Sequence, residues 1–194
     1  TYYRFFHLLN YNKSIDKNYQ LQTMEKGDIV DENLNVLYQV DKEEAHKQGL
    51  LHKTVVAEVV NSKGEWLLVK QAPQKQDPGQ YVSPIGGHVI SGEHEVDALK
   101  REAEEEIGYT GNCDYDFIGH AIFDRNVRSL RENHLFITYL ITSDINPKLN
   151  EESVGFKWFS VEEIKKLLRE KPEMFGQSFH FLVKKMFAKE FLTG

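Results

Sequence analysis

Continuous and alternating runs of aliphatic residues along the chain predict several β-strands. Two such runs, KTVVAEVV and WLLVKQ, lie on either side of residues 61–64, where Asn and Gly favour a turn. This pattern predicts a β-hairpin. By the same criteria, we expect two short strands within residues 28–40 around a turn at 31–33, and further strands at 114–125, 134–144 and 155–159.

Apolar residues spaced three and four apart predict helices between the strands. The strongest pattern covers residues 94–107 and ends at Gly108, a residue type that commonly terminates helices. Residues 160–170 begin with Ser160 as an N-cap and Glu163 three positions later, which is a capping-box pattern. A short helix at 41–49 and an amphipathic helix at 175–192 complete the set. Strands with a few helices between them predict a layered α/β domain with a mixed sheet.

Domain organisation and composition narrow the class of protein. We treat residues 1–23 as an N-terminal appendage and residues 24–194 as a single domain, because no linker or repeat divides the chain. A formal net charge of −6 argues against sequence-independent binding to a nucleic acid polymer. No apolar run approaches the roughly 20 residues that cross a membrane. Cys113 is the only cysteine, which rules out an intrachain disulfide and fits a cytoplasmic location. These features leave the oligomeric state, monomer or homodimer, open.

Four glutamates crowd the predicted helix at 94–107. Glu102, Glu105 and Glu106 share one face of this helix, whereas Glu104 projects elsewhere. The three lie beside the apolar stripe of the helix rather than opposite to it. That stripe consists of Val96, Leu99, Ala103 and Ile107. Two interpretations follow: an exposed acidic face, which is the common reason for a charge run, or a site for Mg²⁺ or Mn²⁺, which prefer carboxylate oxygens.

The sequence around these glutamates resembles the signature of the Nudix hydrolases. Gly87 is followed after five residues by Glu93 and, after seven more, by REAEEEIGY at 101–109, so every charged and glycine position of that signature is filled. The resemblance implies an α/β/α sandwich with a mixed β-sheet between helices. It also implies divalent-metal-dependent hydrolysis of a diphosphate bond, in a nucleoside diphosphate linked to another moiety or in a related small organic diphosphate.

The same resemblance assigns a task to each residue of the signature. Glu102, Glu105 and Glu106 would coordinate Mg²⁺ or Mn²⁺, with help from the Gly87 carbonyl. Glu105 would take the proton of the attacking water, although the residues alone leave open which glutamate is the general base. Glu93 would fix the loop, Arg101 would orient a glutamate, and Gly108 would end the helix.

Outside the signature, the chain also resembles type 1 isopentenyl-diphosphate isomerases, from about residue 27 to the C-terminus. That resemblance implies a second metal site for Mn²⁺ or Zn²⁺, with the ligands His46, His52, His88, Glu132 and His134. Surface or packed histidines are the alternative. The basic side chains that would bind the diphosphate of the substrate are Lys70 and Lys75.

One departure from the isomerases favours hydrolysis. The essential cysteine of the isomerases would fall at Gly86, which has no side chain to act as an acid. Two alternatives stay open: an isomerase-like enzyme that uses Glu132 as its acid, and a non-catalytic sensor that binds a nucleotide. The sequence does not identify the group attached to the diphosphate, and segments 72–81, 123–133 and 173–181 are the loops that we expect to contact it.

Overall fold

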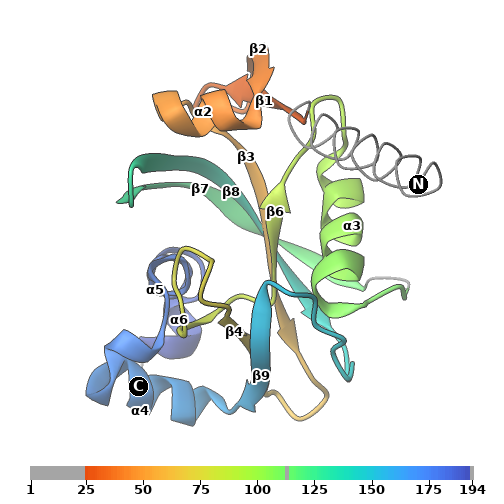
Figure 1. The fold of residues 1–194 in the computed structure, drawn as a ribbon. Coiled ribbons are helices and arrows are strands. Elements are labelled where there is room, and N and C mark those ends of the chain that lie inside the picture. The colour runs from red at the N-terminus through yellow and green to blue at the C-terminus, as the bar shows by residue number, and fades with distance from the viewer. Residues whose placement is uncertain (1–24, 112–113, 193–194) are drawn as a thin grey trace, which may run out of the picture.

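The computed structural model describes residues 25–111 and 114–192 of the chain (Figure 1). The appendage predicted at 1–23 and Cys113 lie outside these residues, so what the sequence indicates about them stays a prediction. No helix within the described residues is long and apolar enough to cross a membrane.

The strands of the described residues form one mixed sheet. They are β1 (Lys26–Val30), β2 (Val36–Asp41), β3 (His52–Val60), β4 (Trp66–Gln71), β5 (Tyr81–Val82), β6 (Ile85–His88), β7 (Tyr115–Val127), β8 (Leu130–Thr142) and β9 (Ser153–Phe159). The helices are α2 (Lys42–Gln48), α3 (Glu95–Ile107), α4 (Val161–Glu170), α5 (Gln177–Lys185) and α6 (Ala188–Phe191), with a short 3-10 helix η1 (Pro172–Met174) before α5.

Strand β3 is the centre of the sheet. It pairs in parallel with β8 along its whole length and antiparallel with β6 at residues 54–57. The predicted hairpin turn at 61–64 is confirmed, but only two residue pairs join β3 to β4 before these strands diverge. Strand β4 then pairs with β9, while β7 and β8 form a long antiparallel hairpin. The mixed sheet expected from the sequence is confirmed.

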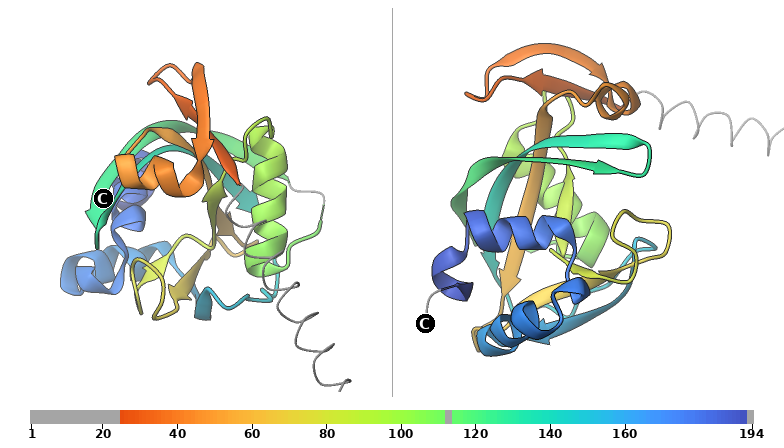
Figure 2. Two further views of the ribbon diagram at one scale, coloured as in Figure 1. Left: turned by 45° about the horizontal axis from the view of Figure 1, so that its top comes forward. Right: turned by 90° about the vertical axis from the view of Figure 1, so that its left-hand side faces the viewer.

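Alternate residues of β3 point to opposite faces of the sheet, and each face carries its own hydrophobic core. Val55 and Val59 pack on one face with Leu99 of α3. Val56 belongs to the core on the other face, together with Phe179 of α5. Helix α3 covers the first face, and α4, α5 and α6 cover the second (Figures 1 and 2), so the predicted α/β/α sandwich is confirmed.

The caps of α3 and α4 follow the sequence pattern with one exception. His94 precedes α3 and accepts a backbone hydrogen bond at 3.3 Å, and Gly108 ends the helix in the left-handed conformation at φ 68°. The Ser160 hydroxyl accepts a hydrogen bond from Glu163 N at 3.1 Å, as predicted. The Glu163 carboxylate does not complete the capping box and accepts a hydrogen bond from Lys157 Nζ at 2.6 Å instead.

Three boundaries differ from the expectation. Strands β7 and β8 continue through residues predicted as their connection and leave only Arg128, at φ 55°, and Ser129 between them. Residues 85–88, for which the hydrophobic pattern predicts no element, form β6, because their backbone pairs with β3 although IGGH carries no strand pattern. The tail predicted as one helix at 175–192 divides into α5 and α6, which are separated by Met186 and Phe187.

Candidate active site

Helix α3 packs its glutamates beside β6, the strand that carries Gly86 and Gly87. The Glu102 carboxylate occupies the space where a side chain at Gly87 would begin, since a Cβ at that position would overlap it. Glu106 accepts a hydrogen bond from Gly86 N at 2.6 Å. Glu105 is exposed. Two of the three predicted ligand glutamates thus contact the glycine strand, and the third faces solvent.

The surroundings of Glu102 and Glu106 disfavour a negative charge. Burial raises the pKa of Glu106 well above its usual range, and the charges of Glu102 and Glu152 raise it further. Burial also raises the pKa of Glu102, against the hydrogen bond from Arg101 and with an added contribution from Glu105. A divalent cation would offset both the desolvation and the repulsion, so these carboxylates fit such an ion.

The guanidinium of Arg101 is engaged by several protein groups. Its Nε and Nη2 donate to the two oxygens of Glu93, both at 3.0 Å, and Nη2 also donates to the His88 carbonyl at 2.9 Å. Nη1 donates to Glu102 at 2.5 Å and lies 3.8 Å from a Glu105 oxygen. Glu93 accepts a further backbone hydrogen bond from the preceding loop at 3.0 Å. These contacts allow Arg101 to orient Glu102, and they allow Glu93 to hold the loop that precedes α3.

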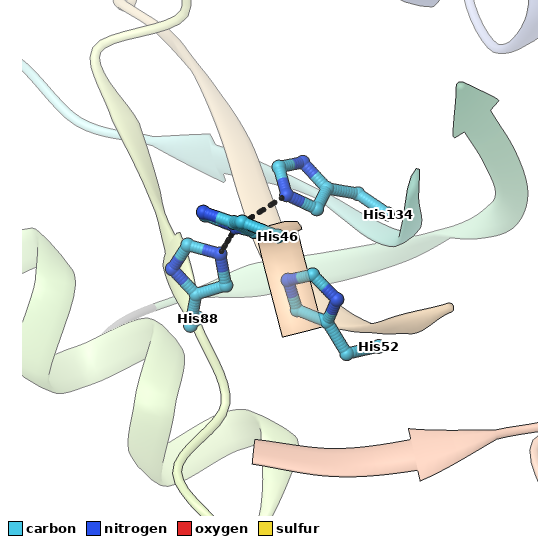
Figure 3. A group of neighbouring side chains, drawn as sticks. All are labelled: His46, His52, His88 and His134. Carbon is cyan, nitrogen blue, oxygen red and sulfur yellow. Dashed lines mark hydrogen bonds between the residues drawn. The ribbon is translucent and has the colours of Figure 1, made fainter. Parts of the chain in front are cut away.

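Four histidines meet near one end of β3 (Figure 3). They come from four elements: His46 from α2, His52 from β3, His88 from β6 and His134 from β8. His46 Nε2 lies 3.0 Å from His88 Nε2 and 3.3 Å from His134 Nε2. One potential ligand atom from each ring lies within 4.8 Å of the others, and within residues 25–111 and 114–192 no other such group of three or more side chains is found. We call these four residues the histidine cluster.

The histidine cluster favours neutral imidazoles, the form that binds metal ions. Burial lowers the pKa of all four side chains, and for His52 it lowers the pKa to about 4. His52 Nδ1 donates to the Leu50 carbonyl at 2.7 Å, which leaves its buried Nε2 as an acceptor without a hydrogen-bond partner. A buried, unpartnered imidazole nitrogen beside three other rings fits a metal ion.

The structure does not bring Glu132 into the histidine cluster, although the resemblance implied it as a ligand. Glu132 is buried on β8, two residues before His134, but its Oε2 accepts a hydrogen bond from Arg125 Nε at 2.6 Å. Arg125 also donates to both oxygens of Asp77, at 2.8 and 2.9 Å. The group available to a metal therefore consists of imidazoles without a carboxylate.

The two lysines expected to bind a diphosphate lie in different surroundings. Lys75 Nζ forms an ion pair with Glu152 Oε2 at 2.5 Å, and both charges act on the pKa of Glu106. Lys75 is therefore close to the glutamates of α3. Lys70 is exposed on β4. Diphosphate binding by either lysine stays a prediction.

A comparison with models of protein families identifies the family of this chain. The sequence model of the NUDIX domain matches residues 50–179 of the chain. The chain belongs to the Nudix hydrolase family. As a Nudix hydrolase, it falls among enzymes that cleave pyrophosphate bonds and generally use divalent metal ions.

The relatives of this chain include an isomerase and an uncharacterised Nudix hydrolase. The isopentenyl-diphosphate Delta-isomerase 2 of Photorhabdus laumondii is 29% identical over 153 residues, which cover 76% of this Nudix chain and 84% of the isomerase. An uncharacterised Nudix hydrolase of Yersinia pestis is 37% identical over 86 residues, which cover 43% of this chain and 47% of that protein. The crystal structure of DR0079 from Deinococcus radiodurans covers 84% of this chain and 99% of its own, with a TM-score of 0.68 and 21% identity, and supports the fold.

Sequence reasoning missed two features of this Nudix hydrolase. Arg125 forms the ion pairs with Glu132 and Asp77 described above. Only the register of the β7–β8 hairpin and the path of the 72–81 loop could indicate these contacts. Glu58 is fully buried on β3, where its Oε1 accepts a hydrogen bond from Ser83 Oγ at 2.6 Å and its Oε2 has no partner. A single charge within the aliphatic run VVAEVV was the available signal.

Gly87→Ala should lower the hydrolytic turnover of this Nudix hydrolase by about a hundredfold, because the added methyl group would displace the Glu102 carboxylate. Gly86→Ala is the matched control. A Cβ at Gly86 meets only the Val55 carbonyl oxygen, at 3.9 Å, and the backbone N–H that binds Glu106 is kept. We expect Gly86→Ala to stay within about threefold of wild-type turnover. Measuring kcat and thermal unfolding for both variants checks this, and equal losses would contradict the assignment of Gly87.

Proposed function

We propose that this protein uses Mg²⁺ or Mn²⁺ to hydrolyse a diphosphate bond, in a nucleoside diphosphate linked to another moiety or in a related small organic diphosphate. The observation that carries the proposal is the position of Glu102 and Glu106, which are held against the glycine strand and removed from water. The partner of the enzyme in this proposal is a small molecule, rather than a nucleic acid polymer or a membrane.

The residues that would hold the metal are Glu102, Glu105, Glu106 and the Gly87 carbonyl. When bound, the ion would supply positive charge against the diphosphate oxygens and would activate water for attack on phosphorus. The chain itself fixes two of these carboxylates in advance. Arg101 binds Glu102, and Gly86 N binds Glu106, so neither side chain has to be ordered when the substrate arrives.

Glu105 is the best-placed general base. It is exposed, and its nearest Arg101 nitrogen is 3.8 Å away, beyond hydrogen-bond distance. Its carboxylate can therefore accept a proton from water. Lys75, close to Glu106, would exchange its ion pair with Glu152 for a phosphate oxygen, and Lys70 would supply a second positive charge from β4.

Two observations weigh against the isomerase-like alternative. Gly86 brings no acid to β6, and Glu132 is bound to Arg125, so neither position offers a free acid to protonate an alkene. Deuterium incorporation from heavy water into isopentenyl diphosphate would favour the isomerase. Thermal stabilisation by a nucleotide without any turnover would favour the sensor.

We also propose that the histidine cluster is a second metal site, for Zn²⁺ or Mn²⁺. Its support is the short separation of the four ligand atoms, the burial of the rings and the unpartnered Nε2 of His52. His46, His52, His88 and His134 would supply one nitrogen each. Four nitrogen ligands match the coordination number that Zn²⁺ adopts in structural sites.

A phosphatase-coupled phosphate-release screen tests the proposed hydrolysis. Dinucleotides, nucleotide sugars, nucleoside triphosphates and prenyl diphosphates are supplied with Mg²⁺ and, separately, with Mn²⁺. We expect turnover of at least one nucleoside diphosphate derivative or prenyl diphosphate, and a loss of at least about a hundredfold when EDTA removes the metal. Turnover that survives EDTA unchanged would overturn the metal-dependent mechanism.

A further inference from the structure

Arg125 holds Glu132 in a buried network of ion pairs. The two residues face each other across the β7–β8 hairpin, where they pair in register. Arg125 Nε donates to Glu132 Oε2 at 2.6 Å, while Nη1 donates to both oxygens of Asp77. The side chains of Arg125 and Glu132 are only 9% and 7% exposed, so their charges are shielded from water. Charge-assisted hydrogen bonds in such surroundings hold a carboxylate more firmly than an exposed ion pair does.

This contact matters because of where Glu132 lies on β8. Glu132 and His134 are two residues apart on one strand, so their side chains point to the same face of the sheet. His134 belongs to the histidine cluster, whereas Glu132 does not. The carboxylate nearest to the cluster along this strand is thus engaged by Arg125.

The ligand set decides which metal such a cluster prefers. Four neutral imidazoles suit Zn²⁺, whereas Mn²⁺ favours sites that include carboxylate oxygens. We propose that Arg125 is a positioning residue that keeps the Glu132 carboxylate out of the histidine cluster and thereby sets the preference of this site for Zn²⁺ over Mn²⁺. This inference rests on the metal-binding role proposed above for the four histidines.

Zn²⁺ and Mn²⁺ titrations of the metal-stripped full chain test the inference, with the affinity of each metal measured by competition against a chromophoric chelator. His46→Ala identifies the part of the binding that belongs to the histidine cluster rather than to the glutamates of α3. Arg125→Met frees Glu132, and we expect it to raise the Mn²⁺ affinity of the cluster about tenfold relative to Zn²⁺. Adding Glu132→Gln to Arg125→Met should remove this gain.

Two further variants separate this role from a merely structural one. Asp77→Asn is the matched control, because it breaks the other ion pair of Arg125 and leaves Glu132 bound, so the ratio of the two affinities should not change. Glu132→Gln alone should leave both affinities within about threefold of the wild type. This variant keeps the positive charge of Arg125 and carries the test even if Arg125→Met fails to fold.

The outcomes are distinguishable. A tenfold loss of affinity in Glu132→Gln alone would show that Glu132 is already a ligand and would overturn the inference. A folded Arg125→Met chain with an unchanged ratio of affinities would overturn it as well. Wild-type metal binding that is unaffected by His46→Ala would refute the histidine site and this inference together, while hydrolysis at the glutamates would be untouched.

Discussion

Glu105→Gln and Glu106→Gln should each lower kcat for diphosphate hydrolysis by about a hundredfold or more, with the fold intact. Each substitution replaces a carboxylate of the proposed metal site by a neutral amide. Glu106→Gln can keep the hydrogen bond from Gly86 N, because the amide oxygen accepts it as the carboxylate does. The measurement is steady-state turnover of the substrate found in the screen, at saturating Mg²⁺ and at saturating Mn²⁺.

Glu104→Gln is the matched control for this pair. Glu104 lies on the same helix and is exposed, and its replacement should leave turnover unchanged. Thermal unfolding separates a catalytic loss from misfolding. Because burial raises the pKa of Glu106, a neutral amide at this position should unfold at the same temperature as the wild type or at a higher one at pH 8. Wild-type turnover in both Glu105→Gln and Glu106→Gln would refute the assignment of the site.

Glu58→Gln should change the difference between the free energies of unfolding at pH 4 and at pH 8 by on the order of 3 kcal/mol. Burial raises the pKa of Glu58 from 4.5 to about 7, against the hydrogen bond from Ser83. As pH rises from 4.5 to about 7, the unfolded chain loses this proton while the folded chain keeps it. The contribution of Glu58 to wild-type stability therefore falls across this window and levels off above it, whereas glutamine cannot ionise.

Urea unfolding at pH 4 and at pH 8 measures this difference. The free energy of unfolding of Glu58→Gln minus that of the wild type should be higher at pH 8, by the amount given above, and any constant cost of the amide cancels in the comparison. Ser83→Ala provides a second check. It removes the hydroxyl that lowers the Glu58 pKa, so the upper end of the window should move above pH 7. A difference between Glu58→Gln and the wild type that does not vary with pH would contradict the buried, protonated carboxyl.

The features of the sequence that predicted the fold are local ones. Helix α3 was predictable because its apolar spacing and Gly108 both act within a few residues of the chain. Strand β6 was not predictable in this way, because Gly86 and Gly87 supply no side-chain pattern and their strand depends on pairing with β3. The β7–β8 hairpin was predicted too short, since a non-glycine residue, Arg128, takes the left-handed turn position.

In the candidate site, too, local features were predictable from the sequence and contacts between distant segments were not. Spacing on one helix predicted which glutamates share a face, and the structure adds that the Glu102 carboxylate packs against Gly87. The histidine cluster needs parallel pairing of β3 with β8, a contact between distant segments that no local pattern encodes, and only the resemblance to the isomerases grouped these residues. The engagement of Glu132 by Arg125 was missed because it depends on the register of two strands.

His88 connects the histidine cluster to Arg101, the residue that binds Glu102. Its ring lies in the histidine cluster, while its carbonyl accepts a hydrogen bond from Arg101, the residue that also binds Glu102. A displacement of His88 would therefore act on Arg101, which contacts one carboxylate of the proposed catalytic site. Thermodynamic linkage makes the effect reciprocal: if an ion on the imidazoles strengthens binding at the glutamates by some factor, an ion at the glutamates strengthens the imidazole site by the same factor. The two sites would then fill cooperatively rather than independently.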